Sequence, residues 1–216
     1  MKNQQPHSRL HHSRGSLFVL STKSTGVVAA VAVGLAAAAR PSAAKMTNGA
    51  LLISVGALQC CWLGANLAIS FLEAPVKFLA PSPSRRGLID VGRHVFSALN
   101  KVEVILAAFD ILGWYLLTQR GLIVPLSTGW TIGSNHAGFR HLGPRYWLQF
   151  TPGVIVLLLQ SFGFLPIMRS VGERFIEGRP VENPRVHGVY VALEAVKVAA
   201  LAFSTVSVGK ALLKLT

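Results

Sequence analysis

Ionisable side chains interrupt the long apolar segments of this chain at the spacing of a helix face. Glu103 and Asp110 stand seven residues apart, and Glu194 and Lys197 stand three apart. Side chains separated by three, four or seven residues share one side of an α-helix. Intramembrane acids with this placement form proton relays, and they also form hydrogen-bonded pairs that fix how helices pack. The residues therefore allow either a proton or ion path or a structural polar core.

The same spacing recurs in four apolar segments, each of which has one stripe of polar or small residues. The stripes are Gln59, Asn66, Ser70 and Glu73; then Asn100, Glu103, Ala107, Asp110 and Trp114; then Gln149, Gly153, Val156, Gln160 and Gly163; and finally His187, Tyr190, Glu194, Lys197, Leu201 and Ser204. Polar groups that faced lipid would lack hydrogen-bond partners, so the stripes should turn inward. The pattern predicts an all-α fold, a polytopic membrane four-helix bundle with a polar interior.

Four segments are long and apolar enough to supply these helices, since about 20 residues cross a bilayer. We expect spans at about 47–72, 95–118, 146–168 and 189–212. Pro75 and then Pro81 and Pro83 should end the first span, because proline cannot continue a helix interior. Trp114 and Tyr115 are expected as anchors at the membrane interface. The Gly-rich stretch 121–144 is expected to be a loop, with a short re-entrant or interfacial piece at 121–129.

Composition supports a membrane protein and argues against binding of nucleic acid. The chain is 51% hydrophobic and only 13% charged, whereas soluble domains average about 25% charged residues. Its net charge of +13 is spread over the N-terminal tail and the connecting loops, where it would meet anionic lipid head groups. The adjacent cysteines Cys60 and Cys61 are expected to be small apolar helix residues, too close in sequence to bridge each other.

Residues 1–45 form a basic segment with no acidic residue, which we interpret as a targeting or disordered region preceding the transmembrane domain at 46–216. The apolar run 25–39 is short for a span and suits a signal or presequence core. A fifth transmembrane helix is the alternative. A presequence would place the protein in an organellar inner membrane, mitochondrial or plastid. Without one, a bacterial-type plasma membrane is expected.

Orientation follows from the basic residues near helix ends. The connections before the second span and before the fourth span carry more Lys and Arg than the 121–144 loop, which slightly favours placing them in the cytoplasm or matrix. Counting the whole tail on the side of the 121–144 loop reverses the result.

Motifs of soluble-type enzymes are absent from the sequence. There is no Walker loop, GxSxG, HExxH or paired CxxC, so we predict no catalytic residue, no metal site and no cofactor. His94 and His187 begin the second and fourth spans, on the same side of the membrane, as two axial haem ligands would have to. Neither histidine lies deep in a span and no CxxCH occurs, so haem is not expected.

Three stretches carry a resemblance to a known family. They are FLEAPVKF, GRHVFSALNKVE and IEGRPVENPRVHGVYVALEAVKV. Over roughly residues 46–213 the chain resembles a family of small bacterial integral membrane proteins of unassigned function, which have about four helices. The resemblance marks the residues Glu73, Pro75, Lys77, Arg93, Asn100, Glu103, His187, Tyr190, Glu194 and Lys197. The first 45 residues and the longer 121–144 connector depart from the family's pattern.

These observations define the expected site. The candidate buried polar or ion-path residues are Glu73, Asn100, Glu103, Asp110, Glu194 and Lys197, and the candidate interfacial residues are Lys77, Arg93, His187 and Tyr190. The leading hypothesis is a non-enzymatic structural or accessory subunit, whose partners are the bilayer and either a second copy or a larger membrane complex. The alternatives are a proton- or ion-coupled carrier or channel, which would work as a dimer, and a membrane enzyme.

Overall fold

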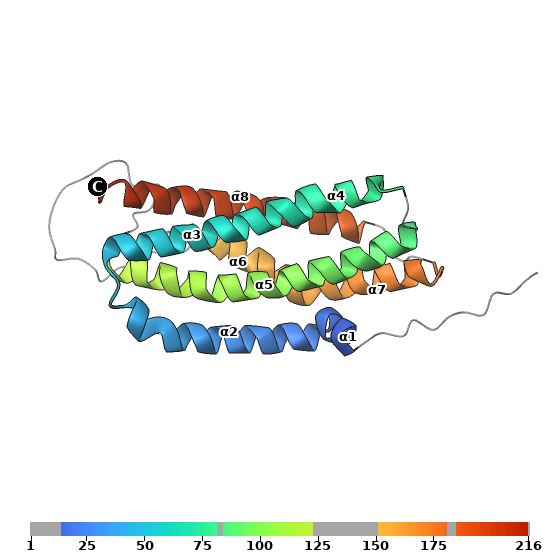
Figure 1. The fold of residues 1–216 in the computed structure, drawn as a ribbon, viewed down its shortest axis with the longest axis horizontal. Helices are drawn as coiled ribbons and strands as arrows, with labels where there is room; N and C mark the ends of the chain where they lie inside the picture. The colour runs from blue at the N-terminus through green and yellow to red at the C-terminus, as the bar shows by residue number, and fades with distance from the viewer. Residues whose placement is uncertain (1–13, 82–83, 123–150, 181–184, 216) are drawn as a thin grey trace, which may run out of the picture.

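The computed structural model describes residues 14–81, 84–122, 151–180 and 185–215. The described part is helical throughout, which confirms the predicted all-α bundle (Figure 1). Its elements are α1 (Arg14–Leu20), α2 (Thr22–Ala43), α3 (Asn48–Asn66), η1 (Leu67–Glu73), α4 (Ala74–Val76), η2 (Lys77–Leu79), α5 (Arg85–Gln119), α6 (Thr151–Leu158), η4 (Leu159–Phe164), α7 (Leu165–Ile176) and α8 (Val186–Leu212).

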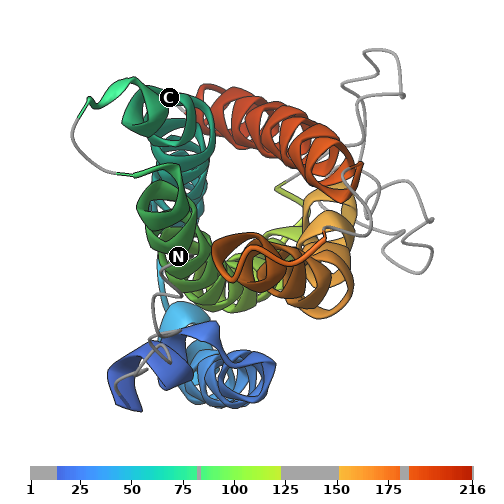
Figure 2. The same ribbon diagram turned by 90° about the vertical axis from the view of Figure 1, so that its right-hand side faces the viewer.

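Four long helical rods lie side by side around a common axis. They are α3 with its continuation to η2, then α5, then α6 with η4 and α7, and then α8 (Figure 2). Helix α2 lies outside this ring and packs on α5. The predicted loop piece at 121–129 and the start of the predicted third span fall almost entirely outside the described residues.

Among the described residues, four helices are long and apolar enough to cross a membrane. They are Thr22–Ala43, Asn48–Leu79, Thr151–Ile176 and Val186–Leu212. This set differs from the predicted one, because it includes α2 and lacks the predicted span 95–118 within α5. Helix α5 carries Lys101, Glu103 and Asp110 in its middle, which lowers its hydropathy. It nevertheless lies in the ring between the apolar helices, as the predicted bundle requires.

Helix α2 is longer than the apolar run from which its role was predicted. It has 22 residues rather than the 15 of the run 25–39, so its length suffices to cross a bilayer. Its buried stripe of Thr25, Ala32 and Ala36 faces α5, where Ala32 and Ala36 pack against Ala108. Small residues at such a contact let two helix backbones approach closely. The N-terminal region thus contains a fifth helix of the bundle, and its role in targeting stays a prediction.

Two of the rods contain a π-helical segment followed at once by a proline. η1 precedes Pro75 and η4 precedes Pro166, and the residues that close them, Ala74 and Leu165, donate backbone hydrogen bonds five residues back. Each proline then lies in the first turn of a new α-helical stretch, where it needs no backbone donor. The prediction that Pro75 ends the first span was therefore wrong, since the rod continues to Leu79.

The helix directions place the chain's basic connections at one end of the bundle. Helices α5 and α8 begin there and α7 ends there, at the right of Figure 1, and the start of α2 points the same way. We call this the basic end, and its described Lys and Arg include Lys23, Lys77, Arg85, Arg86, Arg93, Arg169, Arg174, Arg179 and Arg185. Helix α2 is shorter than α5 and begins level with Lys101, whose Nζ donates to the carbonyl of Val19. Its N-terminus points toward the basic end, whereas Arg40 and Lys45 lie at its other end. The count that placed the whole tail on the side of the 121–144 loop was therefore wrong.

Candidate functional site

Lys197 of α8 lies at the centre of the bundle between two carboxylates. Its Nζ is 2.5 Å from Glu103 Oε1 on α5 and 3.1 Å from Glu194 Oε2 on its own helix. It also donates a hydrogen bond to Gln160 Oε1 on η4, at 2.9 Å. All three ionisable side chains are at most 2% exposed. We call Glu103, Glu194 and Lys197 the charge cluster, and it confirms that Glu194 and Lys197 pair along one helix.

Neighbouring donors complete the surroundings of the charge cluster. Trp62 of α3 donates its indole N–H to Glu103 Oε1 at 3.0 Å, and it is fully buried. Tyr190 lies one turn before Glu194 on α8 and is 4% exposed. The cluster therefore links four parts of the bundle, namely α3, α5, η4 and α8.

Two further polar contacts lie along the same interior. Gln59 of α3 donates from Nε2 to Asp110 Oδ1 at 3.1 Å and to Ser204 Oγ at 2.7 Å. Asn100 donates from Nδ2 to Ser161 Oγ at 2.8 Å. Asp110 thus accepts its hydrogen bond from an amide and not from a lysine. The interior is polar along much of its length, as buried polar groups in lipid require.

Replacing Trp62 by phenylalanine should lower stability modestly. The phenyl ring keeps most of the buried apolar area, but Glu103 loses the N–H at 3.0 Å. Hydrogen bonds in membrane interiors contribute about 1 kcal/mol. Thermal unfolding in detergent, followed by circular dichroism, should show a lower midpoint. In a Glu103→Met background the same change should cost less, and an equal cost in both backgrounds would contradict the contact.

The predicted inward stripes are buried in full in α5, and in α3 and η1 only Gln59 and Asn66 of the four predicted residues are buried. In α8 the stripe holds from Tyr190 to Ser204. The prediction fails within and after the π segments. Gly163 is exposed, and the buried residue after Gln160 and Ser161 is Leu165, because a π-helix has more residues per turn than an α-helix.

Several predicted positions need correction. Glu73 is not buried, since its side chain is 35% exposed and lies 3.4 Å from Lys77 Nζ. Of the four residues expected at the interface, Arg93 and Tyr190 are instead buried within the protein, His187 is exposed and Lys77 is intermediate. Trp114, expected as an interfacial anchor, is also buried, packed in an apolar cluster with Val55 and Leu117. Cys60 and Cys61 are free and exposed, on an apolar helix.

A cavity of about 720 Å³ lies at the basic end of the bundle. Its walls come from η1 to η2, from α5, from α7 and from the start of α8. The described charged residues that line it are Lys77, Arg85, Arg93, Arg169 and Glu194. The rest of the wall is mainly apolar. Tyr190 and Glu194 line the cavity as well, and Glu194 is a member of the charge cluster, so the cavity reaches the polar core.

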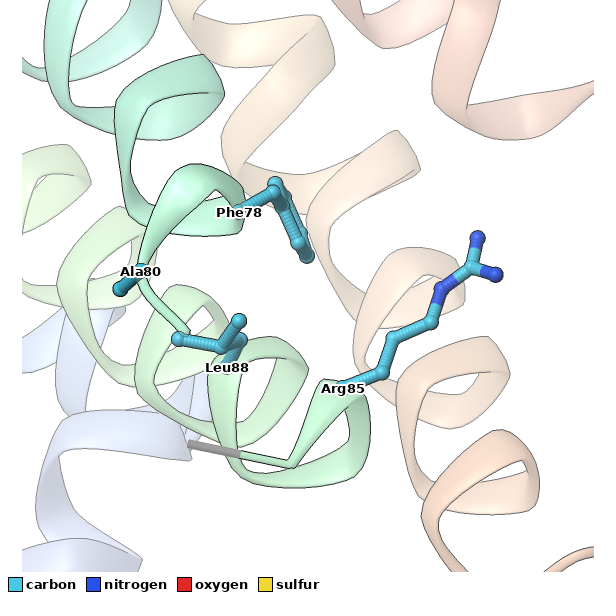
Figure 3. A pocket seen from close by; sticks show the side chains of 4 residues that line it. All are labelled: Phe78, Ala80, Arg85 and Leu88. Carbon is cyan, nitrogen blue, oxygen red and sulfur yellow. The ribbon is translucent and has the colours of Figure 1, made fainter. Parts of the chain in front are cut away.

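A smaller pocket of about 380 Å³ adjoins this cavity where α5 begins (Figure 3). Its lining residues are Phe78, Ala80, Arg85 and Leu88, and all but Ala80 also line the large cavity. In Figure 3 the Arg85 side chain extends from α5 toward α7. Its guanidinium lies 5.8 Å from the ring centre of Phe175, in a cation–π arrangement. Arg85 thus bridges two walls near the end of the bundle.

Two glycines, Gly172 and Gly92, leave room for neighbouring cationic side chains at the cavity wall. A Cβ on Gly172 of α7 would lie 2.6 Å from Arg93 Cδ, and a Cβ on Gly92 of α5 would lie 2.8 Å from Lys77 Nζ. Arg93 contacts Asp90 at 2.7 Å and Glu173 at 3.3 Å, so it is paired although only 5% of its side chain is exposed. A larger residue at Gly172 would displace the Arg93 side chain, and one at Gly92 would displace that of Lys77.

Arg169 was missed as a site residue, because its position after the third predicted span identified it only as a loop charge. It is 9% exposed and donates to Ser97 Oγ at 3.0 Å and to Thr22 Oγ1 at 3.1 Å. No carboxylate lies within 4.0 Å of it among the described residues. Within the same described ranges, no group of three or more His, Cys, Asp or Glu side chains is placed to hold a metal ion.

Comparison with known proteins adds no identification. The chain matches no family model, no curated protein and no solved structure. The resemblance to small bacterial membrane proteins therefore stays a prediction.

Proposed function

We propose that this protein is a proton-coupled membrane carrier, not an enzyme, that binds its ligand in the cavity at the basic end. One observation carries the proposal. Glu194 belongs both to the cavity wall and to the charge cluster with Lys197 and Glu103. A ligand in the cavity would therefore act directly on the residues that hold the buried charge.

The charge cluster can take up a proton without a large rearrangement. Two ionised carboxylates around one ammonium have a net charge of −1, and one added proton makes the group neutral. A buried uncompensated charge is costly in a membrane. A negatively charged ligand near Glu194 would increase that cost and favour protonation. Binding of an anion and uptake of a proton would thus favour each other, as proton coupling requires.

The proposed membrane location concerns both the orientation of the protein and the kind of membrane. The apolar helices place the protein in a membrane, and the concentration of Lys and Arg at the basic end favours this end in the cytoplasm or an organelle matrix. We propose an organellar inner membrane, mitochondrial or plastid, if the N-terminal segment acts as a presequence, and a bacterial-type plasma membrane otherwise. A bundle of this size would transport as a homodimer.

Proton uptake by proteoliposomes tests the proposal. The protein would be reconstituted in lipids extracted from its source membrane, and a potassium diffusion potential would drive protons toward an internal pH-sensitive dye. We expect uptake above that of protein-free liposomes, and we expect Glu194→Gln to remove it. Glu177→Gln is the matched control, because Glu177 is exposed at the end of α7 and lies outside the cavity lining. Absence of uptake in the unmodified protein, or equal uptake in both variants, would contradict proton coupling.

A structural or accessory subunit is the second candidate. It is favoured by the contacts of the charge cluster and Asp110, whose carboxylates each have a donor within hydrogen-bond distance. Such pairs can fix helix register without any transport. Purification from native membranes in mild detergent would distinguish an accessory subunit from a carrier. Stable association with a larger assembly, without proton uptake, would favour the accessory role.

A further inference from the structure

We infer that the cavity binds an anionic single-chain amphiphile, a molecule with one hydrocarbon chain and an oxyanion head group, carboxylate or phosphate. The inference rests on the proposed function in that it assigns a ligand class to the same cavity. It does not depend on proton coupling, because binding and proton movement are measured separately.

The apolar wall suits a hydrocarbon chain. Phenylalanines from four elements line it, namely Phe71 in η1, Phe78 in η2, Phe96 in α5 and Phe175 in α7. The volume of about 720 Å³ lies within the range of roughly 300 to 1,000 Å³ usual for small-molecule sites. Phe71 and Phe78 remain 41% and 49% exposed, so large apolar surface stays uncovered at this wall. A hydrocarbon chain in the cavity would pack against this surface.

The cations of the wall suit an oxyanion. Lys77 and Arg93 already contact carboxylates, but Arg85 and Arg169 have none within ion-pair distance among the described residues. Arg169 is more than nine-tenths buried, and its Nη2 has no hydrogen-bond partner in the described part of the chain. The same holds for Nε of Arg93.

Unused guanidinium donors in a buried site indicate a missing acceptor. Leaving a buried polar group unpaired is costly, and a buried charge more so. The planar fork of arginine matches the oxygens of a carboxylate or phosphate group. Arg169 and Arg93 are also connected, since Arg93 Nη1 donates to the backbone carbonyl of Arg169 at 3.4 Å. An oxyanion at this point would provide acceptors to both side chains while its chain occupied the apolar wall.

The position of the cavity is consistent with entry from lipid at the basic end. Its residues belong to the start of α5 from Arg85 to Phe96, to the start of α8, and to α7 from Leu165 to Phe175. Amphiphiles of the leaflet at this end carry their charged head groups where basic residues attract them. The structure therefore pairs the head with the arginines and the chain with the phenylalanines.

Equilibrium binding to the full-length protein in phosphatidylcholine nanodiscs tests this assignment. The probe is radiolabelled oleoyl lysophosphatidic acid, and oleate is a second oxyanion on the same chain. Oleoyl lysophosphatidylcholine retains the chain with a zwitterionic head, and inorganic phosphate retains the anion without a chain. We expect saturable binding of the first two and none of the last two. Equal binding of the zwitterion, or binding of phosphate alone, would overturn the proposal.

Variants locate the site on the same protein. Arg169→Gln should weaken binding of the lysophosphatidic acid by about tenfold or more, the effect of losing a hydrogen bond to a charged group. Arg179→Gln removes the same charge from an exposed residue at the same end and should leave binding unchanged. Unchanged binding in Arg169→Gln would overturn the assignment. If that variant does not fold, the comparison of the four probes still tests the ligand class.

The two proposals fail separately. Proton uptake without probe binding would reject only the ligand class. Probe binding without proton uptake would reject only the proton coupling.

Discussion

Replacing Lys197 by methionine should be the most destabilising single change in the charge cluster. The substitution keeps an unbranched side chain of similar length but leaves Glu103 and Glu194 without the ammonium that lies 2.5 and 3.1 Å from them. Removing one partner of a buried ion pair costs about 3–5 kcal/mol, because the remaining charge has no counterion. Thermal unfolding in detergent should show a strongly lowered midpoint, and membranes should contain less folded protein.

Two further variants make this prediction specific. Lys210→Met removes an exposed lysine from the same helix and should leave the midpoint nearly unchanged. Adding Glu103→Gln to Lys197→Met should recover part of the lost stability, because one of the two carboxylates no longer carries charge. A double variant no more stable than Lys197→Met alone would show that the ion pair is not what holds the cluster.

Replacing Gly113 by alanine should have the second largest effect, through packing rather than charge. A Cβ at this position on α5 would lie 2.4 Å from Val55 Cγ2 on α3. Val55 is 3% exposed and lies in the apolar cluster with Leu52 and Leu117, so it has little room to move. Overpacking a close helix contact costs about 1–3 kcal/mol. The unfolding midpoint should fall accordingly.

The matched control for Gly113 lies on the neighbouring helix. Gly64 of α3 has no atom within 4 Å of an added Cβ, so Gly64→Ala should be neutral or slightly stabilising. The double variant Gly113→Ala with Val55→Ala should recover stability relative to Gly113→Ala alone. If Gly113→Ala behaves like Gly64→Ala, the close approach of α3 and α5 is not present in the membrane.

Helix periodicity was sufficient to predict much of the polar interior. In α5, steps of three and four residues place Asn100, Glu103 and Asp110 on one face, and all three are buried. The same reasoning identified Glu194 and Lys197 on α8. These predictions succeed because both helices are regular and a membrane penalises polar groups that face lipid. The particular pairs could not be predicted, since Gln59 with Asp110 and Glu103 with Lys197 depend on how helices distant in sequence come together.

The sequence predictions that the structure contradicts failed for both local and non-local reasons. Gly163 was assigned to the inward face because the α-helical period was extended through η4, where the helix is wider. Arg169 was missed because its importance depends on Ser97 and Thr22, which are far away in sequence. Helix α2 was judged too short because only its apolar residues were counted, whereas the helix continues at both ends. Of these three, only the contacts of Arg169 required tertiary information.

The composition of α5 has a consequence for biosynthesis. This helix is not among those apolar enough to span a membrane, and each of Lys101, Glu103 and Asp110 costs about 2.5–3.5 kcal/mol at the centre of a helix that enters a bilayer alone. The partners of α5 on α3 are made before it, but Ser161 and Lys197, which contact Asn100 and Glu103, are made afterwards. We expect the insertion machinery to hold α5 beside α2 and α3 until α8 emerges. Truncation before α8 should therefore leave α5 poorly integrated, although α5 itself is complete.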